Sequence, residues 1–370
     1  MYIKHWLTMS FLTIVLHAIT TDIGYSKSGW EINNHDLLQT QIITSSYSTF
    51  QTRNQSIRGE VLHTLKSQTF YNYEIHNNTS KNDESINFQE PYAVHEFKVR
   101  NTPTVSIRSN SGSIKVEKSS DGKVRIEMYV TRRGLAILSS ERLEDDYRFV
   151  FRQRHNNIYA EVISTKNSAW SSSTPSFDFI VFVPEESNAS LITNSGNISI
   201  AGIQGEMDAR TSKGTISVSR TQGTIRLSTA SGDVEVDSHK GEVFTNSIHG
   251  NINYNNVQGE SRIKVVSGNV TLDEIRGSTL VQSTNGNIDY TARRVDQLVD
   301  LKTVIGNITA KIPRNGAFSF DFHGQSVNLD SFDNFVGDVQ RTYITGTING
   351  GGVPVHATSK LGNVIVQIKQ

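Results

Sequence analysis

Apolar and polar residues alternate in short runs from about residue 93 to the end of the chain. Examples are VHEFKVRN, KVRIEMYV and FDFIVFVP, and Ser, Asn, Asp and Gly are common between such runs. A period of two places the apolar side chains on one face of a half-buried strand. No segment has a convincing 3.6-residue period. The pattern therefore predicts an all-β fold for this part of the chain.

Glycine recurs at every ninth position in the middle of this region. The units alternate between two kinds, represented by SGNISI, KGTISV and SGDVEV and by QGEMDA, QGTIRL and KGEVFT. Two nine-residue strand-turn units thus make a full period of 18, which indicates a repeat architecture. Glycine suits the turns because it accepts positive φ without a steric penalty. The predicted turn glycines are Gly196, Gly205, Gly214, Gly223, Gly232, Gly241, Gly250, Gly259, Gly268, Gly277 and Gly286.

Two architectures fit a nine-residue spacing. One is an antiparallel meander, and the other is a β-solenoid (β-helix) in which each 18-residue lap stacks on the previous one at about 4.8 Å. In the solenoid, each unit stacks on a unit of its own kind, and Asn251, Asn269 and Asn287 form an Asn ladder along one edge. The meander gives no reason for this likeness. We therefore favour a single-domain β-solenoid, in which one lap cannot fold alone.

The chain divides into three parts on composition. Residues 1–25 begin with Lys4 and the mostly apolar run Trp6 to Leu16, which is too short to span a membrane but fits a secretory signal peptide. A buried N-terminal element is the alternative. Residues 26–92 are rich in Asn, Ser, Thr and Gln, and we expect a poorly ordered spacer. Residues 93–370 form the solenoid, with the regular repeat over 193–310 and a C-terminal cap over 311–370.

Charge and cysteine content exclude several functions. Lys plus Arg and Asp plus Glu are both 36, so the formal net charge is zero, which argues against nucleic acid as a partner. Cysteine is absent, so disulfides and thiol nucleophiles are excluded. No later segment is long enough to span a membrane, and we expect an exported protein that is periplasmic, secreted or on the cell surface.

The repeat units and the C-terminal run GTINGGGVPVHATSKLGNVIVQI, from Gly346 to Ile368, resemble a known family. They are similar to the bacterial putative adhesin domains, a family of unknown function, over about residues 93–370. The resemblance implies a β-solenoid in a cell-envelope context. It implies no catalytic residues and no particular binding partner.

The outer faces of the repeat supply candidate binding residues. Stacking at 18 residues places Asp208, Arg226 and Arg262 in one column, with Lys264 beside them, while the Asn ladder forms an edge. Regular calcium binding is not expected, because the units lack the second Gly and the Asp of the calcium β-roll. Asp233, Glu235 and Asp237 share one outer face, which we interpret as a solvated strand. We predict no metal site and no cofactor.

No catalytic motif is present in the sequence. His239 and His249 are placed on or near turns without a partner at triad or ligand spacing. The leading hypothesis is a non-enzymatic structural or adhesion module of the cell envelope that binds a glycan or an envelope protein. A polysaccharide-active β-helix, either a lyase or a hydrolase, is the alternative. A filament-forming scaffold is a third possibility, and the export signal weighs against it.

Overall fold

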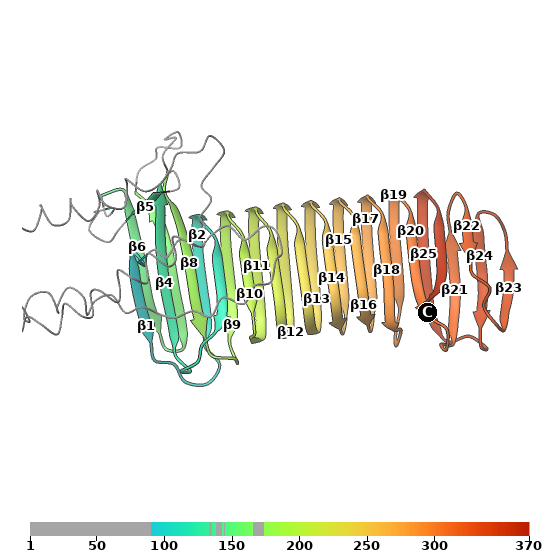
Figure 1. The fold of residues 1–370 in the computed structure, drawn as a ribbon, viewed down its shortest axis with the longest axis horizontal. Helices are drawn as coiled ribbons and strands as arrows, with labels where there is room; N and C mark the ends of the chain where they lie inside the picture. The colour runs from blue at the N-terminus through green and yellow to red at the C-terminus, as the bar shows by residue number, and fades with distance from the viewer. Residues whose placement is uncertain (1–89, 133–134, 138–142, 144, 166–173, 370) are drawn as a thin grey trace, which may run out of the picture. The chain divides into compact units, whose positions relative to one another are not determined.

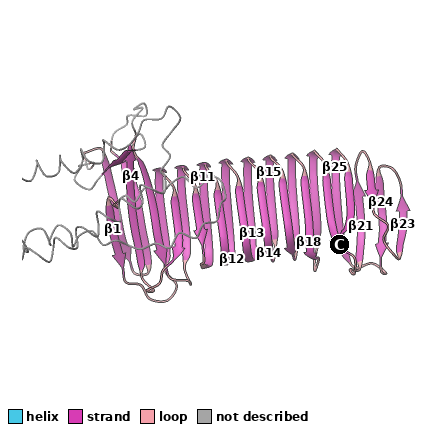
Figure 2. Ribbon diagram, viewed as in Figure 1, coloured by secondary structure: helices cyan, strands magenta, loops and turns pink. Residues whose placement is uncertain are grey.

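The computed structural model describes residues 90–132, 135–137, 143, 145–165 and 174–369. These residues form β-strands and no helix (Figure 2). The predicted signal peptide, residues 1–25, and nearly all of the predicted spacer lie outside the described part. Both therefore stay predictions.

The strands stack side by side in two rows (Figure 1), which are joined because β12 and β13 run through both. In pairing order, the first row contains β1 (Ala93–Phe97), β4 (Val124–Arg132), β8 (Ser176–Val183), β3 (Ile114–Lys118), β10 (Ile198–Ala201), β12 (Ile216–Ser231), β13 (Val234–His249), β14 (Ile252–Gln258), β16 (Val270–Arg276), β18 (Ile288–Arg294), β20 (Ile308–Pro313), β26 (Val364–Lys369) and β22 (Val327–Leu329), and β5 (Leu135–Ile137) pairs with the end of β4.

The second row contains, in the same sense, β6 (Tyr147–Arg154), β7 (Asn157–Ser164), β2 (Thr104–Ser111), β9 (Asn188–Ser195), β11 (Gln204–Lys213), the later halves of β12 and β13, β15 (Ser261–Ser267), β17 (Thr279–Asn285), β19 (Val299–Ile305), β25 (Val353–Leu361), β21 (Phe318–His323), β24 (Tyr343–Ile348) and β23 (Phe335–Val339). Neighbours in the middle of both rows are parallel. The fold is therefore a β-solenoid and not an antiparallel meander.

The register of the middle strands joins residues that are 18 positions apart. Ile216 of β12 pairs with Val234 of β13, and further along the same two strands Ile225 pairs with Val243. All four side chains are buried. Between β17 and β19 the offset grows to 20 residues, since Thr279 pairs with Val299.

The core consists of side chains that point between the two rows. Alternation in β12 buries Ile216 and Val218 from the first row and Ile225 and Leu227 from the second, each at most 1% exposed. The column partners of these residues are also mostly apolar. Like-on-like stacking thus builds one continuous core from strands that could not bury enough surface alone.

Two columns of glycine form the turns, and the predicted period is present in the backbone. All eleven predicted turn glycines have positive φ, from 120° to 152°. The corner that holds the glycine column from Gly205 to Gly277 has a second residue with positive φ, because Arg220, Ser238, Asn256 and Glu274, each three positions before a column glycine, adopt φ between 51° and 55°. These residues are also 18 positions apart. Most laps therefore occupy this second left-handed position with a residue other than glycine.

The chain does not stack in strict sequence order at the C-terminal end. β25 pairs with β19, and β26 pairs with β20, so the last two strands continue the regular stack. β21, β23 and β24 lie beyond them, with antiparallel pairing. The segment 311–370, which we expected to act as a cap, therefore contributes both a further pair of stacked strands and the terminal cap.

Candidate functional site

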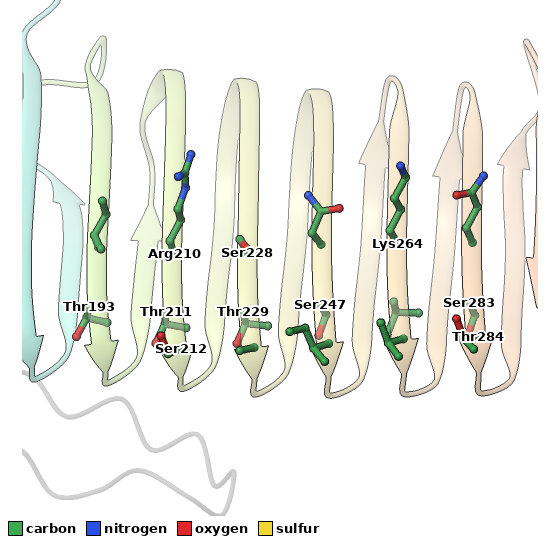
Figure 3. Close-up of a pocket in the computed structure, with 17 residues that line it drawn as sticks. Thr193, Arg210, Thr211, Ser212, Ser228, Thr229, Ser247, Lys264, Ser283 and Thr284 are labelled. Atoms are coloured by element: carbon green, nitrogen blue, oxygen red, sulfur yellow. The ribbon is translucent and has the colours of Figure 1, made fainter.

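A groove of about 620 Å³ follows the outer side of the second row from β9 to β17 (Figure 3). Its central column contains Arg210, Ser228, Asn246, Lys264 and Gln282, one from each successive strand. Outward side chains project here because alternation places their neighbours, such as Leu227 and Ile263, in the core. The centre of the groove is thus a line of polar groups at strand spacing.

One wall of the groove is apolar and exposed. Ile248 and Val266 line it and are 48% and 49% exposed, and Ala230 precedes them on β12. The alternation is inverted at this point, because the inward neighbour Ser247 is polar and 5% exposed. Sequence reasoning did not select this wall. The signal it missed is an apolar residue at an outward position, directly after a polar residue at an inward one.

The column beside the polar column, outside the groove lining, carries several of the predicted site residues. Asp208, Arg226, Phe244 and Arg262 pair across successive strands in one column. The Cζ atoms of Arg226 and Arg262 lie 5.4 Å and 5.7 Å from the centroid of the Phe244 ring. A second hollow of about 390 Å³ includes Phe244 and Arg262 and shares Lys264 with the groove. The structure therefore brings the predicted Arg226, Arg262 and Lys264 together.

Three carboxylates on this face are each held by a neighbouring cation, whereas the exposed Glu206 and Glu242 form no ion pair within the described residues. Asp208 accepts two hydrogen bonds from Arg210, at 2.9 Å from Nε and 2.6 Å from Nη2, which raises the pKa of Arg210. Glu260 pairs with Arg262, and Asp300 lies 2.6 Å from Lys302 Nζ.

Arg226 and Lys264 are the exceptions to this pairing. Within the part of the chain that the structure describes, neither side chain forms an ion pair. On this outer face, Lys264 in the groove and Arg226 in the column beside it are therefore available to an anionic partner.

The predicted Asn edge is present but lies in the turns. The backbone N–H of Asn269 donates to Asn251 Oδ1 at 3.1 Å, and that of Asn287 donates to Asn269 Oδ1 at 2.9 Å. The ladder extends to Asn307 and Asn363. These three predicted residues do not line the groove. Their side-chain oxygens bond to the backbone of the following strand, so their observed contacts serve the stacking.

His239 lies next to the corner residue Ser238, and its side chain is buried inside the fold. It is 2% exposed, and its Nδ1 lies 2.9 Å from the hydroxyl of Thr221, its partner in the preceding strand. Desolvation by burial is the largest influence and lowers the pKa of His239 to about 4. The side chain is therefore neutral at pH 7 and belongs to the core.

Two features of the described residues concern metal binding and membrane spanning. That part of the chain holds no group of three or more His, Asp or Glu side chains arranged to bind a metal ion. It also contains no helix long and apolar enough to cross a bilayer.

Comparison with solved structures gives distant matches. A putative adhesin from Parabacteroides distasonis matches at 13% identity and a TM-score of 0.38, covering 75% of this chain and 96% of that chain. A putative adhesin from Bacteroides fragilis matches at 12% and 0.36, with coverage of 75% and 96%. A putative lipid binding protein from Parabacteroides distasonis matches at 12% and 0.31, with coverage of 76% and 97%. No curated protein matches the sequence.

The family comparison covers the middle and the C-terminal part of the solenoid. The model of the Toastrack DUF4097 family matches residues 184–245 and again residues 223–367. The two overlapping matches fall on the parallel strands that stack in register, together with the terminal cap. They confirm the family resemblance that the repeat units and the C-terminal run had indicated. Through residues 184–367, the chain belongs to the Toastrack DUF4097 family.

Proposed function

We propose that this protein is an exported, non-enzymatic module of the cell envelope or cell surface that binds a glycan or an envelope protein through the groove of the second row. The observation that carries this proposal is the groove itself. It is open along several strands and combines a polar column, an exposed apolar wall at Ile248 and Val266, and the unpaired cation Lys264, with the unpaired Arg226 in the column beside it. An extended surface of this kind suits weak contacts that gain strength by multivalency.

The module is proposed to consist of 18-residue laps, each made of two strand-turn units. The pairing of Ile216 with Val234 and of Ile225 with Val243 supports this lap. The proposed layout keeps a cleaved signal peptide over residues 1–25, a spacer over 26–92 and the solenoid over 93–370. In this arrangement, the spacer holds the binding module at a distance from its point of attachment or release.

A polysaccharide lyase or hydrolase is the alternative function, and the groove lining, which holds no carboxylate among the described residues, argues against it. Hydrolysis requires a carboxylic acid and a second carboxylate that flank one bond. Asp208, Glu260 and Asp300 belong to different strands or turns of the stack, and each is held by its own cation. Ion pairing favours the ionised form of a carboxylate, which opposes the raised pKa that a general acid needs.

Binding to native envelopes tests the proposal. Purified protein clustered on beads is mixed with intact envelopes, and both retention and the release of reducing ends or unsaturated sugars are measured. The groove variant is Ile248→Asp. The matched control is Leu361→Asp, which changes an aliphatic side chain of similar exposure, 55%, outside the groove lining.

We expect retention that falls in Ile248→Asp and persists in Leu361→Asp, with no sugar release above a heat-inactivated control. Equal retention of both variants contradicts binding through the groove. Sugar release that is absent from the heat-inactivated control contradicts the non-enzymatic function and favours the lyase or hydrolase.

A further inference from the structure

Cations of the groove and of the column beside it occur on alternate strands from β12 to β19. On the outer face of the second row, β12 carries Arg226, β15 carries Arg262 and Lys264, and β19 carries Lys302. The strands between them present Phe244 and Asn246 from β13, and Leu280 and Gln282 from β17. Arg262 and Lys302 are paired with Glu260 and Asp300, so the unpaired positive charges are Arg226 and Lys264, two strands apart. Since adjacent strands are about 4.8 Å apart, this separation along the stack is about 10 Å.

Phe244 fixes the spacing of two of these charges. Its ring lies between Arg226 and Arg262, with the Cζ atoms 5.4 Å and 5.7 Å from the ring centroid. Cation–π contact restrains long arginine side chains that would otherwise sample many rotamers. The guanidinium groups are thus partly ordered before any ligand binds, which lowers the entropy cost of binding.

The shape of the groove suits an extended ligand that runs along the stack. The centre offers a hydroxyl at Ser228 and amides at Asn246 and Gln282, one per strand, beside the apolar wall at Ile248. One sugar unit extends a linear polysaccharide by a distance close to the spacing of adjacent strands in a sheet. Each sugar therefore meets one hydrogen-bonding side chain, and two sugars separated by a third meet Arg226 and Lys264.

We infer that the groove binds an acidic linear polysaccharide in which charged and neutral sugars alternate. This inference rests on the proposed function and adds the chemical class of the ligand. Arg226 and Lys264 receive carboxylates of the polymer, because neither forms an ion pair within the described residues. Exposed ion pairs are individually weak, so affinity depends on several contacts and falls as ionic strength rises.

Three polymers distinguish this inference from simpler explanations. Hyaluronan carries one carboxylate for every two sugars, polygalacturonate carries one on every sugar, and dextran carries none. Binding of the full chain to each is measured by biolayer interferometry at two salt concentrations, with polymer expressed as carboxylate or, for dextran, as sugar. The variants are Arg226→Gln, Lys264→Gln and Phe244→Leu. The matched control is Lys311→Gln, an exposed lysine on the first row.

We expect hyaluronan to bind at least as tightly per carboxylate as polygalacturonate, and dextran to bind at least about tenfold more weakly. Arg226→Gln and Lys264→Gln each weaken hyaluronan binding about two- to fivefold, the range of an exposed ion pair, and Lys311→Gln leaves it unchanged. Phe244→Leu weakens it without a change in charge. Thermal unfolding of each variant confirms that the fold is intact.

Four results overturn the inference. Equal binding of dextran and hyaluronan contradicts a role for charge. Tighter binding of polygalacturonate per carboxylate contradicts a preference for alternating charged and neutral sugars. Unchanged binding in both Arg226→Gln and Lys264→Gln contradicts binding of the polymer by these two cations. If no polymer binds while the retention on envelopes remains sensitive to Ile248→Asp, the inference fails and the proposed function stands.

Discussion

Gly232 lies against the carbonyl oxygen of Gly214, so closely that a Cβ atom added to Gly232 would be 2.1 Å from that oxygen. The same relationship continues along the stack, with Gly250 against Gly232 and Gly268 against Gly250. Each glycine therefore serves two purposes, because it adopts positive φ and also lets the backbone of the previous lap approach. A side chain is excluded at these turns by the neighbouring turn as well as by local conformation.

Replacing Gly232 with Ala should destabilise the fold strongly. The new methyl group would overlap the Gly214 carbonyl at a φ of 143°. The matched control is Gly122→Ala, where φ is 68° and no atom lies within 4 Å of the added Cβ. We expect a loss of about 1–2 kcal/mol in the control, from backbone conformation alone, and a clearly larger loss at Gly232. Urea unfolding measures both, and equal losses would contradict the role of close approach.

Charge placed on the inner face should be far more damaging than a change on the outer face. Val236 is 1% exposed and its neighbour Glu235 is exposed on the same strand. Val236→Asp buries a carboxylate without a partner and should cost several kcal/mol. Glu235→Gln should change the free energy of unfolding by less than about 0.5 kcal/mol. Thermal unfolding compares the two, and similar tolerance would show that the inner and outer faces have been exchanged.

Acid should weaken the fold through His239. Its pKa is lowered by burial to about 4, below the ordinary value of 6.5, so the unfolded chain takes up a proton that the folded chain refuses. The stability contributed by the neutral ring is complete above pH 6.5 and is lost as the pH falls towards 4. The loss is about 3 kcal/mol.

Replacing His239 removes this acid sensitivity. His239→Val matches Val257, its partner in the next strand, and should flatten the pH dependence between 6.5 and 4. His249→Val, at an exposed position, should leave it as in the parent protein. Urea unfolding at several pH values provides the measurement. Equal pH dependence in the parent and His239→Val would show that the ring is not the source.

A column of buried hydroxyl groups should stabilise the turns. Thr211 Oγ1 donates to the carbonyl of Gly196 at 3.0 Å, and Ser359 Oγ donates to Gly306 at 2.7 Å. Thr211→Val keeps the shape but leaves the carbonyl without this donor, and we expect a loss of about 1 kcal/mol. Val265 occupies the same column, and we expect Val265→Thr to be tolerated because its hydroxyl can donate to a glycine carbonyl as that of Thr211 does.

Val218→Thr is the matched control for that last substitution. Val218 is 1% exposed and lies among apolar partners on the first row. Its new hydroxyl should cost about 1–3 kcal/mol. Urea unfolding compares Val218→Thr with Val265→Thr. An equal loss in the two variants would contradict the proposed role of the glycine carbonyls.

The repeat was predictable from the sequence because its causes are local and periodic. Alternation identifies Val218 and Val236 as inward residues, and the glycine period gives the turns. The left-handed corner at Arg220 and Glu274 was not predictable, since neither residue type favours φ near 50°. Stacking on similar corners of adjacent laps determines that conformation, and a single lap read alone does not reveal it.

The ends and the groove were less accessible to sequence reasoning because they depend on long-range contacts. Val299 pairs with Val355, and the chain between them forms the terminal cap. No local pattern shows that the chain returns to complete the stack before it ends. The groove columns of Arg226 and Lys264 followed from the period. The apolar wall at Ile248 could not be predicted from the period, because a single exposed aliphatic residue indicates a surface patch only once its neighbours on adjacent strands are known.

Because the middle strands pair at an offset of 18 residues, the length of the stack can change in fixed steps of one lap. Both ends are closed by antiparallel strands, while neighbouring strands in the middle are interchangeable in register. Removing residues 232–249 would join Ser231 to Gly250 and place Ile252 over Ile216, with all turns and both caps retained. Each such step shortens the stack by about 4.8 Å and shortens the groove by the same amount. Gene duplication or deletion in units of 18 codons can therefore adjust the reach of this surface without designing a new fold.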